Sequence, residues 1–473
     1  MESNALGRFV RGPGPWLIAA VVAFALYFAN PWGEDVPEDP RPIGGVEAFE
    51  ALRERDDVNV LFILVDTLRA DRLRTYGYTR PTSPFFDAIA YQGVRFDRHL
   101  SQSSWTKCSM ASLWTGYHPT RAGVTRFDHT IPEQAKMPAE IFREAGFRTA
   151  GIWRNGWVEG YFGFDQGFEI YTRPNFKPVA SDVRRENPTV THGGTDVDVV
   201  EGAVEFLRAY GRERWFLYLH LMDLHEFVYD SDSAKFGTGN ADIYDNSILR
   251  VNYILDQLFG HLYEAGQLDK TLIVIGSDHG EAFGERGFEG HARTVYPETT
   301  EVPLIFGLPF RLQPGLVVKQ RTENVDIWPT ILDMLGLPAL EDTDGRSRVP
   351  EMLAELRSET PPADETVAVA HLDQTWGQRV DTISPTVSVS EKGFRYVMVR
   401  GPKGNTVEEL FDADQDRREL QNVAEENPEV TARLRDEAER YLEREPPWKD
   451  DAPTLELDEI QLNQLRALGY SLP

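Results

Sequence analysis

Three short runs of almost uninterrupted apolar residues constrain the fold of this chain more than any other feature. They span residues 59–65, 215–220 and 272–277. A strand with one solvated face would alternate apolar and polar residues, whereas these runs suit strands covered on both faces of a parallel sheet. Between them lie helical patterns over residues 138–145, 199–210 and 242–265. Strands that alternate with helices predict an α/β sheet with helices on both faces.

Beyond residue 345 the pattern changes to short strands of the antiparallel kind, at residues 367–371, 386–390 and 394–399. An amphipathic helix is predicted from Pro428 to Leu442, with the proline in its first turn, where a missing N–H does no harm. We therefore expect five segments along the chain. They are an N-terminal signal peptide or signal anchor (1–33), a linker (34–57), the main α/β domain (58–345), a smaller α+β subdomain (346–450) and a C-terminal tail helix (451–473).

The N-terminus has the pattern of an export segment. Arg8 and Arg11 precede an apolar run over residues 16–29, which is short for a membrane span of about 20 residues. Basic residues before a short apolar core indicate a signal peptide or a marginal signal anchor; the alternative is a buried N-terminal helix. We expect an exported, membrane-anchored protein whose main domain lies outside the cytoplasm, in the periplasm or at the extracellular face.

The charge and cysteine counts exclude some partners and some kinds of site. A formal net charge of -27 excludes nucleic acid as an expected partner, because phosphate backbones are bound by basic surfaces. If the substrate is anionic, the positive charge at the site must come from a metal and a few local side chains. The single cysteine, Cys108, allows neither an internal disulfide nor a cysteine-based zinc site.

Two acidic residues follow apolar strands at matching positions. Asp66 ends the first run, and Asp278, followed directly by His279, ends the third. Each aspartate alone could cap a helix or turn. Ligands in such sheets bind beyond the carboxyl ends of the strands, so the three side chains together predict a shared cation site. A cation there would polarise an ester oxygen and lower the pKa of a bound hydroxyl.

The best candidate nucleophile lies within residues 104–116. Small hydroxylated residues there lead into an apolar stretch, as expected where a loop enters a helix. A hydroxyl at a helix N-terminus faces free N–H groups and the positive end of the helix dipole, which favour an anionic ester and an activated alkoxide. Taken alone the segment is a weak signal, because serine and threonine are common helix caps.

Several motifs, in order along the chain, resemble the sulfatase branch of the alkaline phosphatase superfamily. They lie at residues 59–71, 163–168, 219–225, 277–281, 291, 302–305, 326–330, 409–412 and 468–470. The resemblance covers the chain from about residue 58 to its end. It implies an alkaline phosphatase-like α/β fold, with a large, mixed but mostly parallel sheet flanked by helices and a smaller C-terminal antiparallel subdomain.

The most informative departure from this family lies in the segment that contains Thr106. Formylglycine sulfatases carry Cys-x-Pro-Ser-Arg before an apolar stretch that ends in Thr-Gly. Alignment on residues 113–116 places Thr106 at the position of the modified cysteine. Counting from Cys108 instead would put Met110 where proline is needed and Ser112 where arginine is needed. We therefore interpret Cys108 as a small packing residue.

A threonine at this position resembles phosphonate and phosphodiester hydrolases and lipid-headgroup phosphotransferases. The resemblance implies one divalent cation, manganese, zinc or calcium, with four ligands: Asp66, Thr106, Asp278 and His279. A nitrogen ligand favours manganese or zinc over calcium. A formylglycine hydrate can eliminate sulfate, whereas a threonine adduct must be cleaved by attack at phosphorus or sulfur. This difference favours phosphorus chemistry.

Other polar side chains are expected around the substrate. His225 and His291 resemble the family's substrate-side histidines, which could protonate the leaving group or neutralise ester oxygens. Weaker candidates for anion contacts are Lys107, Arg154 and Asn155. His220 alternates with core positions and is expected to be structural. The other histidines are expected at the surface or in the core: His99, His118, His129, His192, His261 and His371.

The sequence thus predicts a metal-dependent hydrolase that cleaves phosphodiester, phosphonate or sulfate-type esters through a covalent threonine intermediate. Two other enzymatic hypotheses stay open: a membrane-anchored phosphotransferase that modifies envelope lipid or glycan, and a true sulfuric ester hydrolase. A catalytically inactive binding protein is disfavoured, because the nucleophile and the three other metal ligands occur together. The sequence leaves the natural substrate and the oligomeric state open.

Overall fold

The structure is a computed structural model that describes residues 39–174, 194–363, 366–380, 382–401, 403–448 and 452–468, together with Tyr470 and Leu472. Residues Arg41–Pro473 pack as one unit. The chain forms several short elements besides the strands and helices of its two larger sheets. They are helices α3 Val46–Glu50, α6 Pro119–Ala122, α11 Pro297–Thr300 and α13 Val349–Leu356, strands β7 Ala282–Phe283 and β8 Glu289–Gly290, and 3-10 turns η1 Ala51–Glu54, η2 Ala70–Arg72, η3 Arg74–Tyr76, η4 Gly156–Val158, η5 Gly160–Phe162, η6 Leu268–Lys270, η7 Glu285–Gly287 and η8 Asn324–Asp326.

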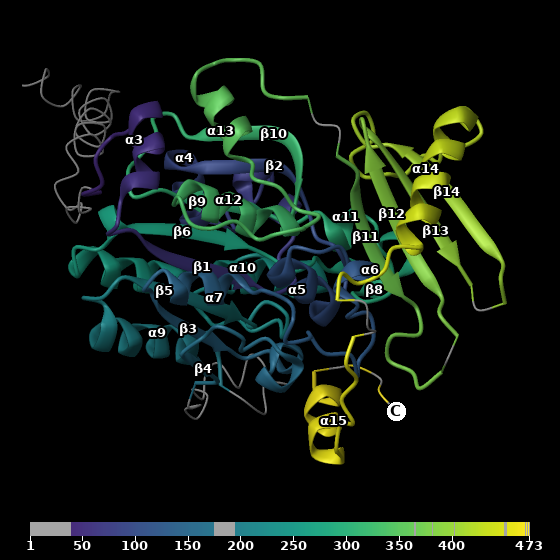
Figure 1. The fold of residues 1–473 in the computed structure, drawn as a ribbon, viewed down its shortest axis with the longest axis horizontal. Helices are drawn as coiled ribbons and strands as arrows, with labels where there is room; N and C mark the ends of the chain where they lie inside the picture. The colour runs from purple at the N-terminus through teal and green to yellow at the C-terminus, as the bar shows by residue number, and fades with distance from the viewer. Residues whose placement is uncertain are drawn as a thin grey trace, which may run out of the picture. The chain divides into compact units, whose positions relative to one another are not determined.

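The main sheet has eight strands in the order β10-β2-β9-β6-β1-β5-β3-β4 (Figure 1). They are β1 Asn59–Val65, β2 Val94–Leu100, β3 Arg148–Trp153, β4 Ile170–Thr172, β5 Trp215–Leu221, β6 Thr271–Gly276, β9 Leu304–Gly307 and β10 Leu316–Glu323. Within this sheet β9 runs antiparallel to both of its neighbours, and every other pair is parallel. The predicted mixed, mostly parallel sheet is confirmed, and the three apolar runs are β1, β5 and β6.

Helices cover both faces of this sheet, which explains why its central strand β1 is apolar from Val60 to Val65. Alternate residues of β1 enter two separate cores: Phe62 joins the core that contains Trp114 and Trp328, and Ile63 joins the other. Helices α5 Thr106–Thr115, α7 Pro138–Glu144 and α12 Ile327–Met334 contribute to the first core. Helices α4 Pro84–Gln92, α9 Asp196–Tyr210 and α10 Asn240–Glu264 contribute to the second.

The C-terminal part forms a four-stranded antiparallel meander, β11-β12-β13-β14, beside which helix α14 lies (Figure 1). Its elements are β11 Ala368–Asp373, β12 Pro385–Glu391, β13 Phe394–Arg400, β14 Thr406–Asp412 and α14 Pro428–Leu442. Leu434 and Ala438 of α14 pack on Val387 and Tyr396 of the sheet. The predicted antiparallel strands and the helix from Pro428 are confirmed. The last helix, α15 Glu459–Arg466, places Leu462 and Leu465 in the core of the main sheet.

The N-terminal prediction requires a correction. No helix in the described part of the chain is long and apolar enough to cross a bilayer, which contradicts the expected transmembrane signal anchor. The apolar segment over residues 16–29 lies outside the described residues, so export stays a prediction. Within the segment expected as a linker, α3 and η1 place Phe49 and Leu52 in the core of the main sheet.

Candidate active site

Asp66 and Asp278 meet because the strands that precede them are neighbours. Strands β1 and β6 pair in parallel, with Leu64 opposite Gly276, so their carboxyl ends deliver both aspartates to one edge. Asp66, Asp278 and His279 are fully buried. Thr67, directly after Asp66, has a φ of 61°, in the left-handed region that a β-branched residue rarely adopts. Strain of this kind persists where the surrounding structure fixes the backbone, often at functional sites.

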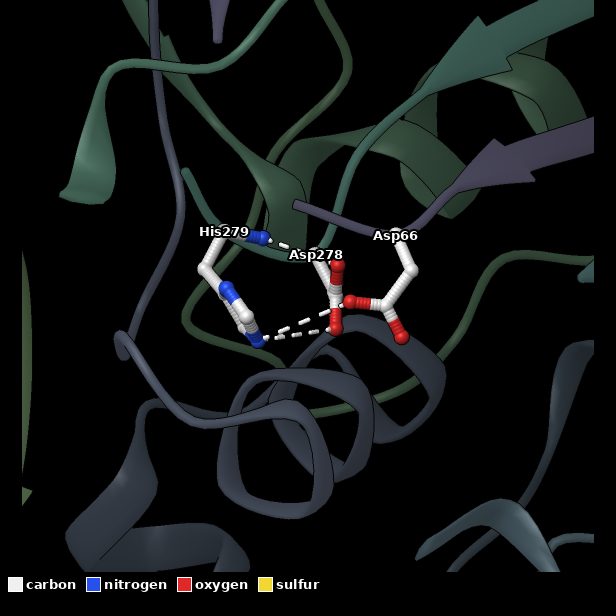
Figure 2. Close-up of side chains that lie close together, drawn as sticks. All are labelled: Asp66, Asp278 and His279. Atoms are coloured by element: carbon white, nitrogen blue, oxygen red, sulfur yellow. Dashed lines mark hydrogen bonds and ion pairs between the residues drawn. The ribbon is translucent and has the colours of Figure 1, made fainter. Parts of the chain in front are cut away.

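Three side-chain atoms converge as a donor set for a cation (Figure 2). Asp66 Oδ1 and Asp278 Oδ2 have no hydrogen-bond partner among the described residues. His279 Nε2 lies 3.3 Å from Asp278 Oδ2 and 3.8 Å from Asp66 Oδ1. His279 Nδ1 lies 3.0 Å from the Gly280 carbonyl oxygen, so Nδ1 carries the proton and the Nε2 lone pair faces the carboxylates. Buried carboxylate oxygens without a donor fit a divalent cation.

The electrostatics of these groups agree with a missing positive charge. Burial and the neighbouring Asp66 raise the pKa of Asp278 to about 7. Burial also acts to raise the pKa of Asp66, but His225 and His220 outweigh it and hold the pKa below its ordinary value. Burial, with His291 nearby, lowers the pKa of His279. One carboxylate is therefore ionised, the other is destabilised by it, and the imidazole is neutral, as a metal ligand must be.

Thr106 begins α5, and its hydroxyl lies beside the donor set. Its Oγ1 is 3.1 Å from His279 Nε2, and the Asn155 amide lies 3.4 Å away as a donor. Cys108, two positions further along the helix, is in the hydrophobic core beneath α5. Burial raises the pKa of the Cys108 thiol to about 12, which leaves it unreactive. The structure thus brings Thr106, and not Cys108, to the carboxylates.

A second layer of donors holds Asp66. Asn155 Nδ2 donates to Asp66 Oδ2 at 2.6 Å, and His220 Nε2 lies 3.1 Å from the same oxygen. Tyr218 donates its hydroxyl to His220 Nδ1 at 2.6 Å, so His220 carries its proton on Nε2 and donates it to Asp66. Asn155, expected at the substrate, instead contacts a metal-ligand candidate. This role of His220 was not predicted from the sequence, because a histidine within an apolar strand resembles an ordinary core residue. The position of His220, one residue before the end of β5 and beside β1, is the feature that could have indicated it.

Two histidines, a glutamate and a tyrosine form the opposite wall. The ring of His291 stacks on that of His279 with centroids 4.5 Å apart and lies 4.9 Å from that of His225. His291 Nδ1 is 2.7 Å from Glu281 Oε2, and Nε2 is 2.7 Å from the Tyr470 hydroxyl. His225 and His291 therefore lie together beside the donor set. Glu281 and Tyr470 lie within motifs that the sequence indicates, but their contacts with His291 arise only in the folded chain.

Lys107 and Arg154 occupy different surroundings from those expected. Lys107 Nζ donates to the Phe127 carbonyl at 2.7 Å and lies 3.4 Å from the ring centroid of Phe162. The buried guanidinium of Arg154 is held by three carboxylates: Asp196 at 2.9 Å, Asp223 at 2.7 Å and Glu226 at 2.5 Å. Both side chains are engaged by the protein itself, because a buried polar or charged group needs local partners.

The other histidines that the structure describes contribute no atom to the donor set. His99, His118 and His371 are buried in the protein. His129 and His261 are half-buried. His192 lies outside the described residues.

A buried Asp-Asp-His donor set at the carboxyl ends of parallel strands, beside a hydroxyl at a helix N-terminus, fits the class of ester hydrolases and offers ligands that a divalent cation could use. The sulfatase family profile matches residues 58–337, more than half of the chain, so this protein belongs to the sulfatase family. A profile for the C-terminal region of N-sulphoglucosamine sulphohydrolase matches residues 284–444. The predicted family and the predicted sulfatase-like ester hydrolase class are confirmed.

Individual relatives are distant. The chain is 25% identical over 389 residues to an ulvan-active sulfatase of Formosa agariphila, covering 70% of this chain and 74% of that protein. Its fold resembles that of a 2-O GAG sulfatase, with a TM-score of 0.67 and 21% identity over 86% of this chain and 96% of that one. It also resembles a phosphonate monoester hydrolase of Agrobacterium radiobacter, with a TM-score of 0.64 and 20% identity over 81% of this chain and 95% of that one. These two likenesses define the fold alone.

Proposed function

We propose that this protein is a metal-dependent hydrolase of phosphodiesters or phosphonate monoesters that uses Thr106 as its nucleophile. One observation carries the proposal: the Thr106 hydroxyl lies 3.1 Å from His279 Nε2, beside two carboxylate oxygens that lack donors among the described residues. The side chains that would hold the cation are those of Asp66, Asp278 and His279, with Thr106 as the fourth ligand. Bound there, manganese, zinc or calcium would supply positive charge to the ester oxygens and to the threonine hydroxyl.

Each of these side chains has a separate role in the proposed reaction. The Thr106 oxygen attacks phosphorus, its bond to phosphorus forms, and the bond to the leaving alcohol breaks. The rings of His225 and His291 lie 4.9 Å apart beside the donor set, and either ring, once it carries a proton on the nitrogen that faces the ester, can donate that proton to the departing oxygen. Water then attacks phosphorus and releases the product from Thr106. A threonine adduct cannot release its phosphoryl or sulfuryl group by elimination as a formylglycine hydrate eliminates sulfate, and this difference favours phosphorus esters.

Sulfate esters are the second candidate substrate class, because the family profile and the Formosa agariphila relative are those of sulfatases. The threonine adduct would then have to be cleaved by attack at sulfur. Both candidates share the anionic ester as substrate and differ in the central atom.

The experiment compares the purified protein with Thr106→Ala and Cys108→Ser. Each is assayed with manganese, zinc or calcium on bis-nitrophenyl phosphate, a phosphonate monoester, nitrophenyl phosphate and nitrophenyl sulfate. We expect cleavage of a phosphorus ester that is lost in Thr106→Ala and kept in Cys108→Ser. Loss that follows Cys108 would overturn the proposed nucleophile. Exclusive cleavage of the sulfate ester would make the protein a sulfuric ester hydrolase, and turnover only with an added acceptor alcohol would make it a phosphotransferase.

A further inference from the structure

The C-terminal tail brings one side chain to the candidate active site. The hydroxyl of Tyr470 lies 2.7 Å from His291 Nε2 and 3.4 Å from His225 Nε2. Thr106 Oγ1 lies 3.1 Å from His279 Nε2, and the ring of His279 stacks on that of His291 with centroids 4.5 Å apart. A residue almost at the end of the chain therefore places a polar atom beside both substrate-side histidines, in the neighbourhood of the candidate nucleophile.

Two sets of apolar contacts anchor this tail. Helix α15 buries Leu462 and Leu465 in the core of the main sheet. A methyl group built on Gly156, the residue after Asn155, would lie 3.2 Å from Leu465 Cδ2, so α15 rests on the loop whose amide holds Asp66. The ring of Tyr470 meets Trp157 at 5.5 Å and Trp376 at 5.6 Å between centroids, edge to face in both pairs. Such aromatic packing fixes the direction of the hydroxyl.

The hydrogen bonds around His291 define which group donates. In the ionised form of Glu281, Oε2 can only accept, and in that form His291 Nδ1 carries the proton of the 2.7 Å contact. His291 Nε2 then accepts the hydroxyl hydrogen of Tyr470. A phenol hydrogen rotates about its C–O bond, so the same donor can turn from His291 to another acceptor placed beside Thr106.

We propose that the C-terminal tail is part of the active site and that the Tyr470 hydroxyl donates a hydrogen bond to a non-bridging oxygen of the bound tetrahedral ester. This inference rests on the proposed function, because it assigns a contact to the substrate of the same site. The acceptor is the anionic phosphoryl, phosphonyl or sulfuryl group. Its oxygens gain negative charge as Thr106 attacks, so the hydrogen bond strengthens in the transition state.

The test uses Tyr470→Phe in the full chain, which removes the hydroxyl and keeps the ring between Trp157 and Trp376. We expect kcat to fall about 10- to 100-fold with KM changed much less, because the lost donor acts chiefly in the transition state. The melting temperature should stay close to that of the unaltered protein. Tyr117→Phe is the matched control: Tyr117 is also buried, but its hydroxyl contacts the Glu341 carbonyl at 3.4 Å. The kcat of Tyr117→Phe should equal that of the unaltered protein.

A double-mutant cycle tests whether the tail delivers the hydroxyl. Leu465→Ala loosens the anchor of α15 and should lower kcat in the same direction as Tyr470→Phe. The two substitutions together should lower kcat no further than Tyr470→Phe alone, because the anchor acts through the hydroxyl. Additive effects would overturn the role of the tail in placing Tyr470.

Binding of orthovanadate separates failure of this inference from failure of the proposed function. If the unaltered protein cleaves esters or binds orthovanadate and Tyr470→Phe does so equally well, the inference is wrong and the proposed function stands. If the unaltered protein binds orthovanadate without cleaving any ester, weaker binding by Tyr470→Phe still supports the contact. If it neither cleaves nor binds, the proposed function fails and the inference with it.

Discussion

The side-chain amide of Asn155 donates a 2.6 Å hydrogen bond to Asp66 Oδ2, the carboxylate oxygen that points away from the cation donor set. The Trp157 N–H in turn donates to Asn155 Oδ1 at 2.8 Å. The amide is therefore fixed at both ends and orients Asp66 so that Oδ1 faces Asp278 and His279. Residues that orient a metal ligand in this way contribute to metal affinity without touching the metal.

Asn155→Ala is accordingly expected to weaken manganese or zinc binding about 10- to 100-fold. Isothermal titration calorimetry on the metal-free protein measures this affinity. Asn252→Ala is the control, because Asn252 is an equally buried amide that accepts from the Phe85 N–H at 2.9 Å, away from the site. It should lower the free energy of unfolding and leave the metal affinity unchanged. Unaltered affinity in Asn155→Ala would contradict the orienting role.

Removal of metal is expected to destabilise the protein, because two buried carboxylates then face each other without a counter-charge. Asp278→Asn should therefore be more stable than the metal-free unaltered protein, by about 1–3 kcal/mol, at a pH above the pKa of about 7 that Asp278 has in the folded state. Its melting temperature should also lose its response to manganese and to chelator. The exposed Asp269 offers the control, since Asp269→Asn should keep that response. A metal response that persists in Asp278→Asn would exclude this carboxylate as a ligand.

Arg154 is expected to matter for stability and not for substrate binding. Arg154→Met leaves Asp196, Asp223 and Glu226 without their shared cation, which should cost about 3–5 kcal/mol in the free energy of unfolding. Urea denaturation measures the loss. Lys136→Met, which breaks a 2.5 Å ion pair with Glu144 between two exposed side chains, should cost less than about 1 kcal/mol. If Arg154→Met instead raises the KM for ester without lowering the free energy of unfolding, Arg154 binds the substrate and the structural role is wrong.

Stability should also depend on pH through Glu419. Burial raises the pKa of Glu419 from 4.5 to about 7. The neighbouring Glu301 also raises this pKa, whereas Arg395 lowers it. The folded state binds this proton more tightly than the unfolded chain, so the contribution is fully present below pH 4.5 and is lost as the pH rises through about 7. Glu419→Gln should flatten the fall in unfolding free energy across that window, as measured by urea denaturation. The exposed Glu426 provides Glu426→Gln as a control, in which the fall should remain.

Much of the fold follows from the chain's own pattern. The runs at β1, β5 and β6 are almost continuously apolar because both faces of these strands are covered, and the pattern shows this directly. The sequence does not reveal β9, a strand of four residues that runs against its neighbours. Its place depends on pairing between distant segments, and no local periodicity encodes such a pairing.

At the candidate site, too, some residues could be predicted from the sequence and others could not. Asp66, Asp278 and His279 could be predicted from sequence, because a polar residue directly after a buried parallel strand lies at the edge where ligands bind. The sequence also predicted that Thr106 lies beside this donor set, and its Oγ1 is 3.1 Å from His279 Nε2; its role as nucleophile stays a prediction. The surroundings of Lys107 and Arg154 could not be predicted, since a basic side chain near a motif looks the same whether it faces a substrate or a buried partner.

What the sequence determined by itself is therefore the class of fold, the family and the side chains able to hold a cation, since these depend on local patterns and on order along the chain. Only the tertiary structure decided that Arg154 is held by three carboxylates, that His220 and Asn155 hold Asp66, and that Tyr470 reaches His291. Tyr470 and His291 are separated by 179 residues. Such contacts arise when distant segments pack around a common core, and the direction in which a side chain then points is set by all of its neighbours together.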